Sequence, residues 1–127
     1  MAEADTTSRK SDSGGDYRDP PAFEVASAGH LFRFHPQGAD RLESLLALIE
    51  GAARTLQLCF YMFQADHTGT VVRDALMRAA QRGVEVRLIV DAFGTDAEPS
   101  FFDPLVRAGG RFSLFSPRWN VRSLIRN

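Results

Sequence analysis

Lysine is nearly missing from this chain of 127 residues, in which Lys10 is the only one. The three histidines are His30, His35 and His67, and none has a lysine two positions later. These 127 residues therefore cannot form a catalytic site that needs a lysine two positions after a histidine.

Cysteine is also scarce, since Cys59 is the only one and no intrachain disulfide can form. It lies in an apolar run, where a cysteine is expected to act as a small core residue.

No apolar run approaches the roughly 20 residues that span a bilayer. The first residues lack the basic and apolar regions of a secretory signal. We therefore expect a cytoplasmic location. The net charge of −1 provides no overall attraction to nucleic acid or to an acidic membrane.

The usual cofactor and metal motifs are missing as well. The sequence has no Gly-x-Gly-x-x-Gly, no Gly-x-x-x-x-Gly-Lys, no Gly-x-Ser-x-Gly and no Cys-x-x-Cys. Asp91 is not followed by a second carboxylate two positions later, so a strand-end Asp-x-Asp site for Mg²⁺ is not supported. We expect no cofactor and no metal.

Hydrophobic periodicity predicts an α/β fold with the order β-α-β-α-β-α-β, a mostly parallel sheet flanked by helices. Residues 1–22 are polar and rich in Ser, Asp, Gly and Pro, which is typical of a disordered tail. The domain is expected over residues 23–127. The predicted strands are 30–34, 56–63, 84–90 and 111–115, and the predicted helices are 40–53, 70–82 and 101–108.

Local signals add detail to these elements. Asp40 is a good N-cap for the first helix, Thr68 or Thr70 can cap the second, and Gly83 suits the position after its last turn. The strands 56–63 and 84–90 are nearly all apolar, so we expect both of their faces to be covered.

A resemblance emerges from the ordered series of these segments. The first is Ala52-Ala-Arg-Thr-Leu-Gln-Leu-Cys-Phe-Tyr-Met-Phe63, followed by Asp66 and by Ala75-Leu-Met-Arg-Ala-Ala-Gln-Arg-Gly-Val-Glu-Val-Arg-Leu-Ile-Val-Asp-Ala-Phe-Gly94. Phe102-Asp-Pro-Leu-Val-Arg-Ala-Gly-Gly110 and Phe115-Ser-Pro117 continue it. Over residues 30–127 the chain resembles the phospholipase D superfamily, most closely its bacterial cardiolipin synthase-like branch.

The resemblance implies a chemistry that these residues do not complete. In that family two His-x-Lys-x-x-x-x-Asp motifs face each other; one histidine attacks phosphorus and forms a phosphohistidine, and the other protonates the leaving alcohol. Leu124-Ile-Arg-Asn127 looks like the run just before the first motif. We therefore expect an inactive N-terminal fragment of a phosphatidyltransferase and assign no catalytic residue.

Two other functions stay open from the sequence. A nuclease or another phosphodiesterase of the same superfamily is one, because the fold does not choose the substrate. A noncatalytic α/β interaction module is the other. The partners implied are a phospholipid or another phosphodiester, the remainder of the parent chain and a peripheral contact with the inner membrane, with nucleic acid still open.

Four residues are candidates for the substrate pocket of the parent. Tyr61, Asp66 and Asp91 lie at or just after the carboxyl ends of predicted parallel strands, where open α/β sheets bind ligands. Asn127 would stand beside the missing histidine. Each has a simpler interpretation: core packing for Tyr61, loop capping for the two aspartates, and a chain end for Asn127.

Arginines dominate residues 107–127, which contain no Asp or Glu. Arg118, Arg122 and Arg126 are candidates for a phosphate-facing rim, because the guanidinium group offers a fork of donors to phosphate oxygens. An ordinary solvated segment is the alternative.

Overall fold

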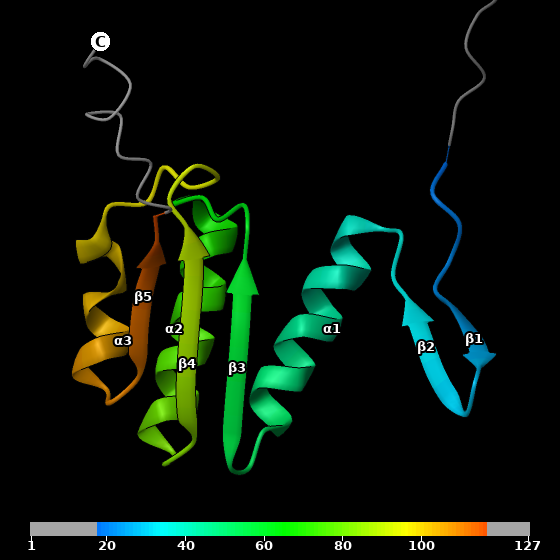
Figure 1. Cartoon of the computed structure of the whole chain (residues 1–127), viewed down its shortest axis with the longest axis horizontal. Coiled ribbons are helices and arrows are strands. Elements are labelled where there is room, and N and C mark those ends of the chain that lie inside the picture. The colour runs from blue at the N-terminus through cyan, green and yellow to red at the C-terminus, as the bar shows by residue number, and fades with distance from the viewer. Residues whose placement is uncertain (1–17, 117–127) are drawn as a thin grey trace, which may run out of the picture. The chain divides into compact units, whose positions relative to one another are not determined.

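A computed structural model describes residues 18–116 of the chain (Figure 1). The chain divides into two compact units, Met1–Arg41 and Leu42–Asn127, and each is described by itself.

The first unit contains an antiparallel hairpin of β1 (Phe23–Ser27) and β2 (His30–Phe34). Ala28 and Gly29 connect the two strands, and both have positive φ, 50° and 78°. Two such residues in a two-residue connection fit the twist of a tight hairpin.

Directly opposed residues share a face of the hairpin, so Phe23, Val25, Phe32 and Phe34 lie on one side. The rings of Phe23 and Phe34 stack with their centroids 5.1 Å apart. All four side chains are exposed. This aromatic side has no cover among the residues of the described part of the first unit.

The first helix, α1, spans Gly38–Gly51 and begins two residues before the predicted start. Asp40 lies inside its first turn, so the prediction that Asp40 is the N-cap is wrong. Its carboxylate is instead 2.9 Å from His35 Nδ1. Ile49, near the other end, is fully buried in the second unit.

The second unit is built on a three-stranded sheet in the order β3-β4-β5, with every pair parallel. This confirms the predicted parallel arrangement of these three strands. The strands are β3 (Thr55–Phe60), β4 (Glu85–Asp91) and β5 (Arg111–Phe115). The connections are α2 (His67–Gln81), then the 3-10 turn η1 (Pro99–Phe102) with α3 (Asp103–Arg107).

The strand at 30–34 does not join this sheet, although the predicted β-α-β-α-β-α-β order placed it there. It pairs with β1, a strand that the prediction lacked. A neighbour only two residues away closes a far shorter loop than a strand beyond a helix, so this pairing costs less chain entropy.

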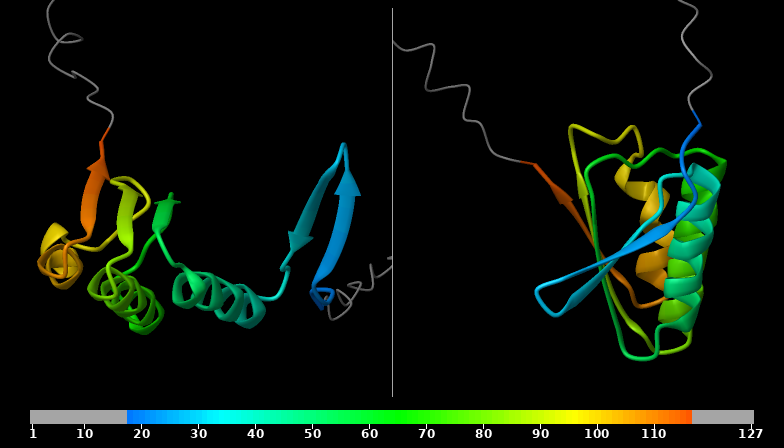
Figure 2. Two further views of the ribbon diagram at one scale, coloured as in Figure 1. Left: turned by 90° about the horizontal axis from the view of Figure 1, so that it is seen from below. Right: turned by 90° about the vertical axis from the view of Figure 1, so that its right-hand side faces the viewer.

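Helices cover one face of the sheet. Figure 2 shows α2 and α3, together with α1, on the same side of β3, β4 and β5. Exposure alternates along β4, with Val86, Leu88 and Val90 buried and the residues between them exposed. In the described residues the other face has no helix on it.

The expectation that both faces are covered is therefore wrong within residues 18–116. Cys59 is exposed rather than part of the core, and Ile89 keeps 44% of its surface accessible. We call the uncovered side the open face.

The core lies between the sheet and the helices. Ile49, Leu76, Leu88, Phe102 and Leu105 are its largest members and have almost no exposed surface. Gly83, at φ 89°, follows the end of α2 as predicted. Among residues 18–116, no helix is both long and apolar enough to cross a membrane.

Candidate functional site at the carboxyl ends of the strands

β3 and β4 run parallel and end side by side, so the loops that follow them meet at one edge of the sheet (Figure 1). We call residues 61–66 and 92–98 the strand-end loops. Open α/β sheets bind their ligands outside the carboxyl ends of their strands.

The two loops are joined by hydrogen bonds. The Phe63 amide donates to the Gly94 carbonyl over 3.2 Å, and the Thr95 hydroxyl donates to the Phe63 carbonyl over 2.5 Å. The Ala65 amide donates to Asp96 Oδ1 over 3.0 Å. These bonds fix the position of one loop against the other without using any large exposed side chain.

Glycine is required where the loops approach most closely. A Cβ at Gly94 would stand 1.8 Å from the Tyr61 carbonyl oxygen, and one at Gly69 would stand 1.9 Å from the Gln64 carbonyl oxygen. Real Cβ atoms do not come so close to backbone, so any side chain at either position would push the loops apart.

Phe63 anchors the first loop in the core. Its side chain is 6% exposed, and its ring packs edge-on against Phe60 and Phe102 at centroid distances of 5.6 Å and 5.2 Å. Phe102 in turn stacks on Phe112 of β5 at 4.2 Å. The site therefore stands on a rigid aromatic layer that links β3, η1 and β5.

Residues of both strand-end loops line an open hollow of about 410 Å³. Three of its side chains are large, apolar and strongly exposed: Tyr61 at 68%, Met62 at 66% and Phe93 at 74%. Its other lining residues are Gln64, Gly94, Thr95 and Asp96.

Of the residues singled out from the sequence, Tyr61 lines the hollow, whereas Asp66 and Asp91 are not among its lining residues. Asp66 is the N-cap of α2, and its Oδ1 accepts a hydrogen bond from the Gly69 amide over 2.8 Å. The expectation that Thr68 or Thr70 caps this helix is wrong. The Thr70 hydroxyl instead donates to the Asp66 carbonyl over 2.8 Å.

Asp91 ends β4 and holds its own loop. Its Oδ1 accepts a hydrogen bond from the Phe93 amide over 2.8 Å, the pattern of an aspartate that stabilises a turn. Contact of Asp66 or Asp91 with substrate stays a prediction. Asn127 and the arginine candidates at 118, 122 and 126 lie outside the described residues.

Sequence reasoning missed most of the hollow, including Gln64, Phe93, Thr95 and Asp96. With its amide nitrogen turned toward Asp96, an orientation assigned from the hydrogen-bonding pattern, Gln64 donates to Asp96 Oδ2 over 2.7 Å. Gly94 was the available signal, because a glycine just after a buried strand often marks a close approach of two backbone segments.

The charged residues of the strand-end loops and Asp91 are all acidic. Residues 61–66 and 91–98 contain Asp66, Asp91, Asp96 and Glu98, and no lysine or arginine. Such a surface repels a phosphate group. Within residues 18–116, no group of carboxylates, histidines and cysteines is arranged to hold a metal ion.

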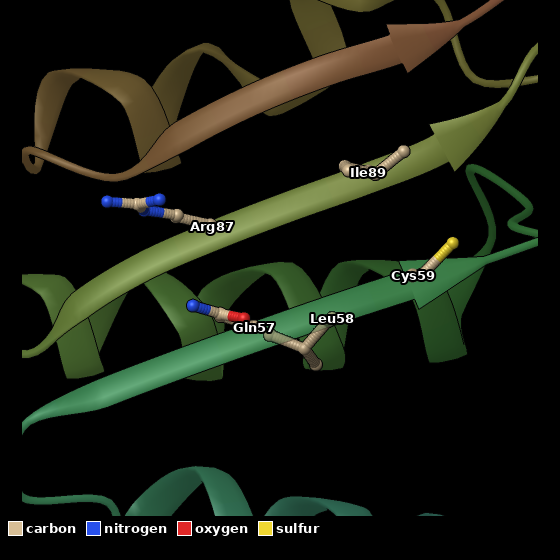
Figure 3. A pocket seen from close by; sticks show the side chains of 5 residues that line it. All are labelled: Gln57, Leu58, Cys59, Arg87 and Ile89. Carbon is tan, nitrogen blue, oxygen red and sulfur yellow. The ribbon is translucent and has the colours of Figure 1, made fainter.

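A second hollow, of about 330 Å³, lies on the open face (Figure 3). Gln57, Leu58, Cys59, Arg87 and Ile89 line it. Arg87 Nε donates to Glu85 Oε1 over 2.9 Å. This hydrogen bond, together with the Arg87 charge, lowers the pKa of Glu85. The positive charge of Arg87 is thus already paired with a neighbour on its own strand.

The fold and the strand-end site define an α/β protein with a parallel sheet and a site at its carboxyl edge. Residues 45–119 match the family described as cardiolipin synthase, PLD-like domain, and the chain belongs to that family. The resemblance to the cardiolipin synthase-like branch of the phospholipase D superfamily is thereby confirmed.

Relatives with this name match only over part of their length. The chain is 35% identical over 89 residues to the cardiolipin synthase of Clostridium perfringens strain 13, covering 67% of this chain and 19% of that protein. It is 36% identical over 81 residues to the major cardiolipin synthase ClsA of Bacillus subtilis strain 168, covering 63% and 17%. The chain thus spans less than a fifth of these relatives.

Proposed function

We propose that this chain is the N-terminal part of a phospholipase D-like phosphatidyltransferase of the cardiolipin synthase type. The family match over residues 45–119 carries the proposal. Relatives named cardiolipin synthase at about 35% identity favour a phospholipid as the substrate of the whole protein. The parallel sheet and its strand-end loops would then form one wall of the substrate site.

The 127 residues by themselves are proposed to be inactive. Phosphoryl transfer through a phosphohistidine, which the resemblance implies, needs a histidine nucleophile and cations that hold the phosphate oxygens. None of His30, His35 and His67 is paired with a lysine, and the strand-end loops carry only acidic charges. We place the whole protein at the inner membrane surface, where its lipid substrate would be found.

The first test is an assay of the purified chain. Vesicles of phosphatidylglycerol would be incubated with it, and cardiolipin would be measured by mass spectrometry, with bis(p-nitrophenyl) phosphate as a general phosphodiester. We expect no turnover of either substrate above a buffer control. Turnover that copurifies with the chain and survives removal of contaminating enzyme would contradict the proposed inactivity.

The second test reads the coding DNA past the codon for Asn127. A continuing frame that encodes His-x-Lys would be expressed as the longer protein and assayed on phosphatidylglycerol vesicles and on DNA. Formation of cardiolipin supports the proposal. Cleavage of DNA without lipid transfer would identify a nuclease, and a stop codon at that point would favour the noncatalytic module.

A further inference from the structure

The strand-end loops present apolar side chains that the fold does not need. Tyr61, Met62 and Phe93 are 66–74% exposed, and the loops are joined by backbone groups, Thr95 and Asp96 instead. Single exposed hydrophobic residues are common on proteins, whereas a group of them around one hollow marks a contact surface. We call these three residues the apolar rim.

The charge around the apolar rim indicates which part of a ligand it can contact. Every charged residue within 61–66 and 91–98 is acidic, so a phosphate group is repelled while an uncharged group is not. Tyrosine and methionine suit a boundary between water and hydrocarbon, because tyrosine joins an apolar ring to a polar hydroxyl and methionine adapts its shape.

We propose that the apolar rim binds the uncharged part of a phospholipid, its glycerol ester region and the first carbons of its acyl chains. This inference rests on the proposed phospholipid substrate. The rim would hold the lipid at the bilayer surface beside the edge of the sheet where the strands end. The phosphate would be bound by groups outside residues 61–66 and 91–98.

The rigidity of the loops supports this assignment. A Cβ at position 94 would stand 1.8 Å from the Tyr61 carbonyl oxygen, so this approach of the loops needs a glycine, and the buried Phe63 holds the first loop in the core. Side chains carried on a fixed backbone lose less entropy on binding than those on a mobile loop. Apolar area buried in a bilayer then adds directly to affinity.

The test is co-sedimentation of the purified chain with vesicles of phosphatidylcholine, which carry no net charge, in low and in high salt. The rim variant combines Met62→Ser and Phe93→Ser. Leu48→Ser is the matched control, because Leu48 is 70% exposed but belongs to α1 and does not line the hollow. Phe32→Ser tests the exposed aromatic side of the hairpin. Circular dichroism and urea unfolding verify that all the variants fold.

We expect the wild-type chain to bind these vesicles with little dependence on salt, and the rim variant to bind about tenfold more weakly or worse. Leu48→Ser should stay within about twofold of the wild type, because Leu48 does not line the hollow. Loss of binding in Phe32→Ser with the rim variant unchanged would place the contact on the hairpin and overturn the inference. A rim variant that folds and binds as the wild type does would overturn the inference. So would a wild-type chain that binds only anionic vesicles and is released by salt, or one that binds no vesicles.

An assay of cardiolipin formation by the longer protein distinguishes failure of this inference from failure of the proposed function. Cardiolipin formation with no contribution from the rim leaves the proposed function in place and rejects the inference alone. Binding to vesicles through the rim, with a longer protein that cleaves DNA and forms no cardiolipin, would reject the proposed function and leave only a lipid contact at the rim.

Discussion

Asp66 fixes the first turn of α2 through one carboxylate oxygen, which accepts from the Gly69 amide over 2.8 Å. The first amides of a helix have no partner within the helix, so a side chain that accepts from one of them stabilises the helix. The same turn brings Gly69 against the Gln64 carbonyl, where only a glycine fits. The start of α2 is therefore determined by two residues, one capping and one small.

Replacement of Asp66 by alanine should destabilise the chain by about 1 kcal/mol, because the Gly69 amide loses its acceptor. Urea denaturation followed by circular dichroism at 222 nm measures this directly. Thr68→Ala is the control, since the exposed Thr68 follows the cap, and it should shift the free energy of unfolding by less than about 0.5 kcal/mol. Equal losses in the two variants would contradict the assignment of the cap.

At the scale of the element, α1 and α2 are linked at their ends by charged groups. Arg78 Nη2 donates to Glu50 Oε1 over 2.8 Å, and Arg82 Nη2 donates to the carbonyls of Ile49 and Glu50 over 3.1 Å. Arg82 thus donates to carbonyls in the last turn of α1, where the helix itself supplies few donors; the Ile49 carbonyl also accepts from the Ala52 amide over 3.4 Å. The hydrogen bond from Arg78 is the main cause of a lowered pKa at Glu50.

This link makes part of the stability depend on pH. The folded-state pKa of Glu50 lies below its ordinary 4.5, so its contribution is complete above that pH and is lost as the pH falls through the folded-state value. The wild type should therefore exceed Glu50→Gln in stability at pH 7, with the difference shrinking toward pH 3. Because the group is on the surface, high salt should also reduce the difference.

Urea unfolding at pH 7, 5, 4 and 3 measures the effect. Glu43→Gln, also on α1, is the control for removing one negative charge from the helix. A difference between the wild type and Glu50→Gln that grows as the pH falls would contradict the role given to Arg78.

At the scale of the whole molecule, the open face and the hairpin leave apolar surface without cover in the described residues. Neighbouring residues on β4 show the contrast, since Ile89 is 44% exposed and Val90 is fully buried. β3 and β5 are also the edge strands of the described sheet. Exposed apolar faces and unpaired edges favour association between chains, so we expect the isolated chain to self-associate.

Comparison of Ile89→Thr with Val90→Thr distinguishes an effect on self-association from an effect on the free energy of unfolding. Ile89→Thr should weaken self-association and change the unfolding free energy by less than about 0.5 kcal/mol. Val90→Thr should cost about 1–3 kcal/mol, because it buries a hydroxyl in an apolar core. Sedimentation velocity over a range of concentrations, with urea unfolding, measures both quantities. A wild-type chain that stays monomeric at high concentration would contradict the prediction.

The sequence by itself was sufficient to predict that β3, β4 and β5 form and that they run parallel. Apolar runs of strand length alternate with segments of helical period, and a helical crossover between neighbouring strands makes them parallel. The same logic predicted that Tyr61 lies at the carboxyl edge of the sheet, and it placed Gly83 after the end of α2. These features depend on residues close together in the chain, so a local pattern is enough to predict them.

Only the tertiary structure decided which apolar residues are covered. Ile89 and Val90 look alike in the sequence, and their burial depends on which side of the sheet the helices pack. Asp66, Thr68 and Thr70 are all competent caps, and only the structure shows that Asp66 is the one that accepts from the Gly69 amide. The hollow, likewise, joins side chains from two loops about 30 residues apart. Each of these depends on contacts between distant segments, which a local pattern does not encode.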